Sequence, residues 1–310
     1  MFNENRIRIW RGFWQLADPK IWIASTVPMA VAAALAYGLE GKFNLYWFFW
    51  SLLGVYLIEI GKNAVNEFVD YESGVDTYVT PDKRTPFSGG KKVIVDGILS
   101  LSEVKVIATV TMIIAGLVGI YVVFAREPEV LWIGVAGFVI AVFYSLPPAK
   151  LCYRGFGEFA VGLTFGPLVL CGTYLVQTHN ISLEAVLSSL ILGLLIANVL
   201  WINQFPDYEA DLRGQKRNWV VRMGKKKATT VFAALFIAAF ALSAVLAFIA
   251  GNPFFLLPLS AFPLARRAVD VARRYYDDIP RLIEANAKTV QAYQLTGLTL
   301  MIGALLNKFL

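Results

Sequence analysis

The chain has very few of the side chains that bind soft metals or form disulfide bonds. Its 310 residues include one histidine and two cysteines. The single His179 argues against a histidine-based metal site or proton relay. Cys152 and Cys171 lack metal-type spacing, so we expect two reduced thiols. Only 16% of the residues are charged and 57% are hydrophobic, which argues against an ordinary soluble domain.

A cleavable signal peptide is also missing, because no cleavage site follows the basic N-terminal stretch, and we expect the first apolar run to stay as a membrane helix. Apolar runs of about 17 to 25 residues predict an all-α polytopic membrane protein with about nine transmembrane helices. The expected spans cover 21–38, 44–65, 104–125, 130–146, 158–177, 184–205, 228–250, 252–265 and 289–307.

The basic residues are distributed asymmetrically over these spans. Only Lys42, Arg126 and Lys308 of the 28 lysines and arginines fall on one face of the membrane. Cytoplasmic loops are enriched in Lys and Arg, so the N-terminus should be cytoplasmic, in a plasma-membrane protein. This distribution explains the basic residues without a nucleic-acid partner, and no obligate protein partner is evident. We expect residues 266–288, charged on most faces, to form a helix at the membrane surface.

Two similar acidic motifs follow two of the apolar runs. They read NEFVDYESGVD at 66–76 and NQFPDYEAD at 203–211. In each motif an Asn and an Asp lie four positions apart and would share one face of a continuing helix. We interpret the motifs as a weak internal repeat in a single transmembrane domain, 1–310, and expect both on the cytoplasmic side, with loops 66–103 and 206–227.

Carboxylates without His or Cys are hard oxygen ligands, which suit Mg²⁺ and a phosphate-bearing substrate. The candidate catalytic and Mg²⁺-binding residues are Asp70, Asp76, Asp207 and Asp211. Glu72 competes with Asp76 as a ligand, because Asp76 is expected in a loop. The candidate diphosphate-binding residues, which supply positive charge or hydrogen bonds, are Asn66, Arg84, Lys91, Tyr144, Lys150, Asn203, Lys216 and Arg217.

The membrane favours a substrate with an anionic head and an apolar tail, and prenyl diphosphates have that shape. Loss of diphosphate from an allylic carbon leaves a cation, which needs a dry chamber with aromatic walls. Tyr144 is the leading candidate to line it. Inside the second expected span, Glu59 could face the bundle and pair with Lys62.

The motifs resemble those of the UbiA superfamily of intramembrane prenyltransferases. Further stretches are similar to the branch that prenylates 1,4-dihydroxy-2-naphthoate for menaquinone. They are DPKIWIASTVP at 18–28, YSLPPAKLCYRGFGE at 144–158, FGP at 165–167 and GTY at 172–174. One departure is Asp18, where many relatives have Arg, and Lys20 is the nearest replacement.

The resemblance implies helices around a central cavity, Mg²⁺ as cofactor, and a prenyl diphosphate such as geranylgeranyl diphosphate or a longer one. An aromatic carbon of the acceptor attacks the allylic cation, and in the naphthoate branch CO₂ is lost. Other acceptors remain open: 4-hydroxybenzoate, homogentisate, haem, chlorophyllide and geranylgeranylglyceryl phosphate. A membrane transporter for an anionic amphiphile is the alternative from another class.

Overall fold

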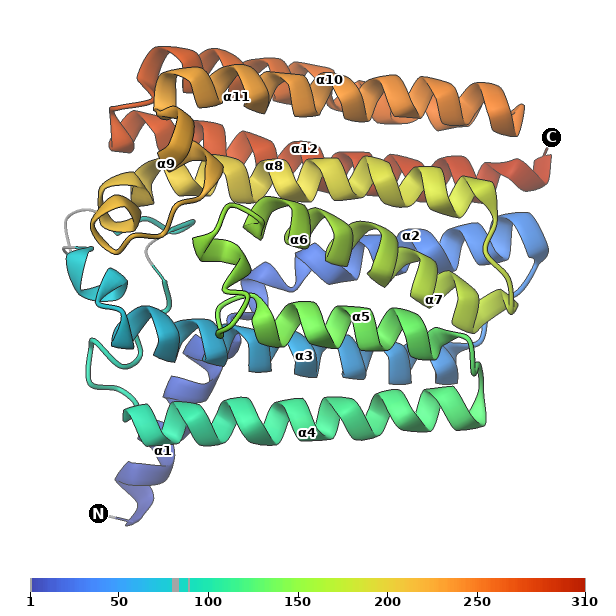
Figure 1. Ribbon diagram of the computed structural model, residues 1–310. Helices are drawn as coiled ribbons and strands as arrows, with labels where there is room; N and C mark the ends of the chain where they lie inside the picture. The colour runs from blue at the N-terminus through green and yellow to red at the C-terminus, as the bar shows by residue number, and fades with distance from the viewer. Residues whose placement is uncertain (1, 80–83, 89, 310) are drawn as a thin grey trace.

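The fold is a bundle of long helices that run side by side (Figure 1), as seen in a computed structural model of the chain that describes residues 2–79, 84–88 and 90–309. The α-helices are α1 Phe2–Ala17, α2 Ile23–Glu40, α3 Leu45–Glu72, α4 Leu101–Ala125, α5 Val130–Phe143, α6 Gly157–Leu163, α7 Val169–Thr178, α8 Leu183–Arg213, α9 Trp219–Met223, α10 Lys225–Ala250, α11 Phe262–Tyr275 and α12 Ile279–Leu306. The π-helical turn η5 Thr164–Leu168 joins α6 to α7, and the 3₁₀ helix η6 Pro253–Ala261 leads into α11.

Within the described residues, six helical segments are long and apolar enough to cross a membrane. They begin at residues 23, 101, 157, 183, 225 and 279. Helices α3, α5 and the η6–α11 segment overlap the three remaining expected spans. The prediction of a polytopic all-α membrane protein is confirmed, with a helix count close to the expected one.

Both helices that carry the acidic motifs extend beyond the expected spans. Helix α3 continues to Glu72, and α8 continues to Arg213. Pro206 lies inside α8, where proline removes one backbone donor, yet the helix runs on without a break. The one-face arrangement expected for each Asn and Asp pair is therefore present in the folded chain.

The prediction of one surface helix over residues 266–288 is wrong. The charged segment is split between the end of α11 and the start of α12, with a turn after Tyr275. The small residues Ala265, Ala268 and Ala272 on α11 are buried, and α11 packs along α12. A stripe of small side chains lets two helices approach closely, so this segment forms a hairpin of the bundle.

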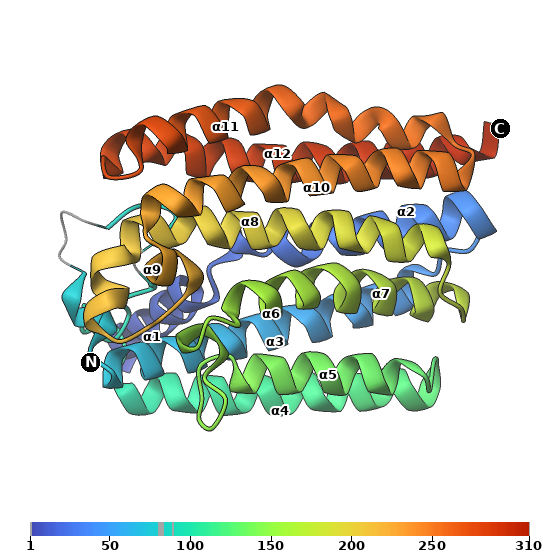
Figure 2. The ribbon, with the colours of Figure 1, turned by 45° about the horizontal axis from the view of Figure 1, so that its top comes forward.

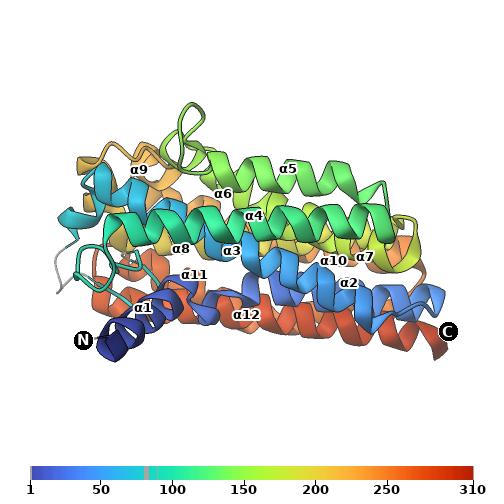
Figure 3. The same ribbon diagram turned by 90° about the horizontal axis from the view of Figure 1, so that it is seen from below.

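The loops after α3 and α8 lie at one end of the bundle, together with α1 and α9 (Figures 1 and 2). The view from below shows α1 at the same end, beside the start of α4 (Figure 3). Arg8 of α1 is bound there to Glu103 of α4, with Nη2 2.6 Å from Oε1. Both acidic motifs thus share one end of the molecule, hereafter the motif end.

Helix η5 crosses α8 with almost no space between the two backbones. A Cβ atom added at Gly166 would lie 2.5 Å from the Ser189 carbonyl oxygen and 2.7 Å from the Gly193 Cα. Only a residue without a side chain fits at such a crossing. This contact holds the α6–η5–α7 segment against α8, and it sets one wall of the cavity described below.

We therefore expect Gly166→Ala to destabilise the protein by about 1–3 kcal/mol, because overpacking forces the backbones apart. The measurement is the thermal unfolding midpoint of purified protein in detergent. Gly116→Ala on α4 is the matched control, since its added Cβ meets nothing within 4 Å. Equal midpoints for the two variants would contradict the close crossing.

Candidate functional site

The two acidic motifs meet through a lysine. Lys216, in the loop after α8, donates from Nζ to Asp70 Oδ2 of the first motif at 3.0 Å. Next to this contact, Gly214 packs so closely on Val75 that an added Cβ would lie 2.1 Å from the valine side chain. The joint site expected from the sequence is therefore assembled from α3, α8 and the loops that follow them.

Asp70 accepts hydrogen bonds from three side chains, Lys216 among them. Its Oδ1 accepts from the Tyr153 hydroxyl at 2.6 Å, and its Oδ2 accepts from Asn66 Nδ2 at 3.1 Å. Asn66 also reaches Ser145 Oγ at 3.0 Å. Asp70 is only 5% exposed, so these donors fix its orientation. Tyr153 was not predicted from the sequence, although it lies in the family-like stretch 144–158.

Asp76 lies in a short 3₁₀ turn after α3, Val75–Tyr78, and is buried. Lys92 donates to its Oδ1 at 2.6 Å and to its carbonyl oxygen at 2.9 Å. Burial and the nearby Asp70 charge raise the pKa of Asp76, against the effect of Lys92. Its Oδ2 is buried and has no hydrogen-bond partner among the described residues, so one ligand oxygen remains available.

Glu72, the competing ligand, points elsewhere. Its Oε1 accepts from Lys105 of α4 at 2.6 Å, in an ion pair whose side chains are 47% and 46% exposed. Such exposed pairs contribute little to stability. The structure thus favours Asp76 over Glu72 as the carboxylate that faces Asp70.

Glu67 holds a loop over the site, a role that the sequence did not indicate. Its carboxylate accepts from the backbone N–H groups of Lys91, Lys92 and Ile94, each at 3.2 Å. Three backbone donors on one carboxylate together hold this segment against α3. We call residues 91–94 the strap. By fixing the strap on α3, Glu67 positions Lys92 at Asp76.

The second motif lies on the last turns of α8. Asp211 is 4% exposed, and its Oδ2 accepts from Asn218 Nδ2 at 2.7 Å. Asn203 Oδ1 accepts from Asn286 Nδ2 of α12 at 2.8 Å. Asp207 is half-buried one turn before Asp211. Asn218 and Asn286 were not predicted, since nothing in their local sequence marks them.

The predicted cations separate into two groups. Lys216 and Lys150 are at the site: their Nζ atoms lie 5.5 and 5.2 Å from the ring centroid of Tyr153. Burial disfavours the charged form of Lys216, but the Asp70 and Asp211 carboxylates outweigh it and hold the pKa of this ammonium well above its usual range. Lys216 therefore stays charged between the two motifs.

The other predicted cations have different partners. Lys91 of the strap forms an ion pair with Asp18. Asp18 stands where many relatives have Arg, and this ion pair holds a lysine beside the start of α2. Arg84 donates two bonds of 3.0 Å to Asp96. Arg217 and Lys20 are exposed. Among the described contacts, none links Arg84 or Arg217 to the four aspartates.

The carboxylates are arranged for a shared ligand rather than for a complete metal cage. Across residues 2–79, 84–88 and 90–309, no three His, Cys, Asp or Glu side chains are grouped tightly enough to hold a metal ion. Mg²⁺ commonly takes one or two carboxylates and completes its shell with water and substrate phosphates. The hard oxygen donors, including the unpartnered Asp76 Oδ2, fit that kind of binding.

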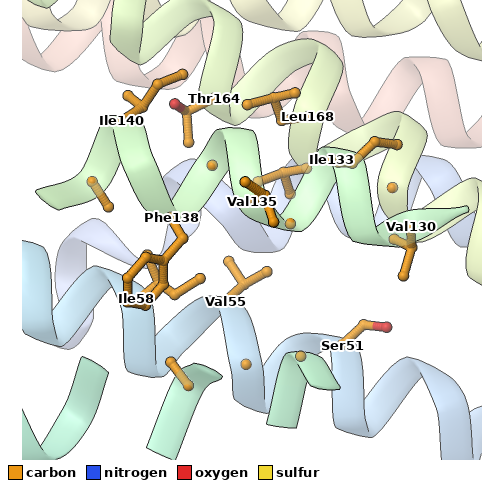
Figure 4. Close-up of a pocket in the computed structure, with 18 of the residues that line it drawn as sticks. Ser51, Val55, Ile58, Val130, Ile133, Val135, Phe138, Ile140, Thr164 and Leu168 are labelled. Carbon is orange, nitrogen blue, oxygen red and sulfur yellow. The ribbon is translucent and has the colours of Figure 1, made fainter. Parts of the chain in front are cut away.

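An apolar cavity of about 400 Å³ begins beside this cluster. Helices α3, α4, α5 and the η5–α7 segment enclose it, and Figure 4 shows Val55 and Ile58 of α3 facing Phe138 of α5. Lys62, Glu59 and Tyr144 line its end nearest the motifs. Tyr144 therefore lies where the sequence predicted it, in the wall of a chamber beside the acidic motifs.

A charged site at one end of a membrane bundle, opening into an apolar cavity, defines a membrane protein that handles amphiphilic anions. Residues 26–288 match the UbiA prenyltransferase family, so the chain belongs to the UbiA prenyltransferase family. It is a multi-pass membrane enzyme, a prenyltransferase.

Curated relatives and a solved structure agree with this assignment. The 1,4-dihydroxy-2-naphthoate octaprenyltransferase of Bacillus subtilis is 28% identical, over 96% of this chain and 93% of its own. The 2-carboxy-1,4-naphthoquinone phytyltransferase of Synechocystis is 25% identical, over 94% and 93%. The structure of a UbiA homologue from Archaeoglobus fulgidus bound to GPP and Mg²⁺ has the same fold, with a TM-score of 0.65, 14% identity and coverage of 96% and 100%.

Tyr153 acts through Asp70, so we expect Tyr153→Phe to lower kcat for prenyl transfer about tenfold or more, the effect of one lost hydrogen bond to a charged group. The Phe ring keeps the packing but loses the donor to Asp70 and the contact with Ser73. Steady-state kinetics in detergent measures the effect. Tyr37→Phe, at an exposed position of α2, is the control; the same kcat in both variants would show that Tyr153 does not position Asp70.

Proposed function

We propose that this enzyme transfers a prenyl group from a prenyl diphosphate to a dihydroxynaphthoate, in the biosynthesis of a menaquinone-type quinone. One observation carries the proposal: Lys216 joins both acidic motifs, through its Nζ to Asp70 and its backbone N–H to the Asp211 carbonyl oxygen, and an apolar cavity that begins at Lys62 of α3 lies beside them. An anionic head and a long apolar tail fit these two environments. The relatives in Bacillus subtilis and Synechocystis, which act on naphthoate-type acceptors by name, support the choice of acceptor.

The four aspartates, Asp70, Asp76, Asp207 and Asp211, would hold Mg²⁺, which would neutralise the diphosphate and help it to leave. Lys216 and Lys150 add positive charge where the leaving diphosphate gains negative charge. Asn66 keeps Asp70 oriented and has a second contact to Ser145. The proposed diphosphate-binding set also includes residues that do not contact the aspartates but lie on the same loops or on α8. They are Arg84, Lys91, Asn203 and Arg217.

The prenyl tail would lie in the apolar cavity. Exclusion of water there protects the allylic cation that forms when the bond to diphosphate breaks. The Tyr144 ring, 8% exposed at the cavity end nearest the motifs, would face this cation and stabilise it through its π-electrons. The aromatic acceptor then forms the new carbon–carbon bond, and its carboxyl group leaves as CO₂.

The enrichment of Lys and Arg in the loops of the motif end supports a cytoplasmic position for this end, in a plasma membrane. A transporter would keep its charged groups near the bilayer midplane on interrupted helices. The four aspartates instead lie at one end of the bundle, which disfavours transport. Another aromatic acceptor is the second candidate, since the motifs recognise the diphosphate and not the acceptor.

The direct test is an assay of purified protein with geranylgeranyl diphosphate, Mg²⁺ and a panel of acceptors, followed by mass spectrometry. We expect prenylated, decarboxylated naphthoate that disappears with EDTA and returns with added Mg²⁺. Asp70→Asn and Asp207→Asn should lose turnover by about a hundredfold or more, because each removes a charged ligand. Both variants should still fold, although Asp70→Asn leaves the buried Lys216 without its charged partner and should lower the unfolding midpoint. Glu209→Gln, on the exposed face of α8, is the control.

Full turnover of Asp70→Asn without Mg²⁺ would refute the metal site. Product with a different acceptor only would keep the chemistry and replace the substrate.

The cavity also predicts a limit on prenyl length. Gly137 of α5 lines it, and an added Cβ would meet only Leu168, at 4.0 Å. Gly137→Phe should fill the space and lower the rate with geranylgeranyl diphosphate at least about fivefold relative to geranyl diphosphate, since the longer tail loses its apolar contacts. Ala136→Phe, next to it but outside the cavity lining, is the control. An unchanged ratio would place the tail elsewhere.

A further inference from the structure

Two charged residues lie in the part of α3 that overlaps an expected membrane span, before the four aspartates in the chain. Lys62 is one turn before Asn66 on the helix, and Glu59 is three residues before Lys62. Both side chains line the end of the apolar cavity nearest the motifs. Charged side chains in this environment are costly and are retained for function. The diphosphate site described above does not use either of them.

The surroundings of the two side chains show what each can still bind. Glu59 is 5% exposed, and its Oε2 accepts from Ser25 Oγ of α2 at 2.9 Å. The Lys62 ammonium lies 5.2 Å from the centroid of the Tyr144 ring. Within the described residues, neither side chain forms a direct ion pair with the other or with a third residue. The pairing predicted from the sequence is therefore absent as a direct contact, although the two opposite charges act on each other.

An acid and a base that face one cavity without pairing can bind a ligand that carries both an anion and a hydroxyl donor. The Tyr144 ring beside Lys62 adds an aromatic surface. The place also suits the reaction: Lys62 is one helical turn, about 5.4 Å of rise, from Asn66, which orients Asp70. A ring held at Lys62 would therefore lie between the diphosphate and the prenyl tail, beside the carbon that leaves the diphosphate.

We infer that Glu59 and Lys62 bind the aromatic acceptor, and that they select a ring with a carboxylate next to a hydroxyl group. Lys62 binds the carboxylate, and Glu59 accepts a hydrogen bond from the hydroxyl. This inference rests on the proposed function for the identity of the acceptor. In 4-hydroxybenzoate the two groups lie at opposite ends of the ring, so a molecule bound to Lys62 through its carboxylate directs its hydroxyl away from that carboxylate and from the neighbouring Glu59.

The test measures acceptor binding separately from turnover. The full chain in lipid nanodiscs is titrated with 1-hydroxy-2-naphthoate, a stable analogue with adjacent groups, and binding is followed calorimetrically. We expect Lys62→Met to weaken the analogue about tenfold to a hundredfold, the loss of a charge-assisted hydrogen bond. Lys62→Arg should restore most of the affinity, and Glu59→Gln should weaken it about tenfold. Lys227→Met, an exposed lysine of α10, is the matched control.

Kinetics then separates the acceptor from the diphosphate. Lys62→Met should raise KM for dihydroxynaphthoate and leave KM for geranylgeranyl diphosphate within about twofold of the parent. A raised KM for the diphosphate alone would overturn the inference and assign Lys62 to the leaving group. Equal binding of the analogue by parent and Lys62→Met, or no binding by the parent, would also overturn it.

The two proposals can fail separately. Analogue binding that depends on Lys62, without any prenylated product, would support this site and refute the proposed reaction. Prenylated naphthoate formed equally well by Lys62→Met would support the reaction and refute this site.

Discussion

The fold at the motif end depends on the cations and hydrogen-bond donors that compensate the buried carboxylates. Asp70, Asp76 and Asp211 are each at most 5% exposed, and a buried charge is costly unless it is paired and hydrogen-bonded. Each of them takes its partner from a distant part of the chain or a following loop: Lys216 binds Asp70, and Lys92 binds Asp76. The carboxylates therefore organise the loops as well as the chemistry.

This compensation also connects the two halves of the bundle. The buried apolar residues form two clusters, one around α2, α7, α8, α10 and α12 and one around α3, the strap and the 144–160 segment. The contact of Lys216 with Asp70 and the packing of Gly214 on Val75 join the clusters at the motif end. The apolar cavity lies between α3, α5 and η5–α7, and it is lined mostly by aliphatic side chains, with several glycines among them. A rigid polar end and a loosely filled apolar interior suit a substrate with a charged head and a long tail.

Much of the site could be predicted from local pattern alone. Hydrophobic run length located the membrane helices, and the four-residue spacing placed Asn66 with Asp70 on one face, as α3 confirms. The partners of those residues could not be predicted, because they are separated from them by long stretches of chain. Tyr153, Asn218 and Asn286 reach the motifs only after the loops have folded, and Glu67 had no local feature to distinguish it from a surface acid.

The sequence by itself determined the membrane class, the two acidic motifs and the family resemblance, because apolar runs and residue spacing are local properties of the chain. Only the tertiary structure decided which cations meet the carboxylates: Lys216 and Lys92 do, whereas Arg84 binds Asp96. It also decided that Glu59 and Lys62 line the cavity without a direct ion pair between them. The physical reason is that the direction of a side chain follows from helix crossings and loop paths, which depend on contacts between distant residues.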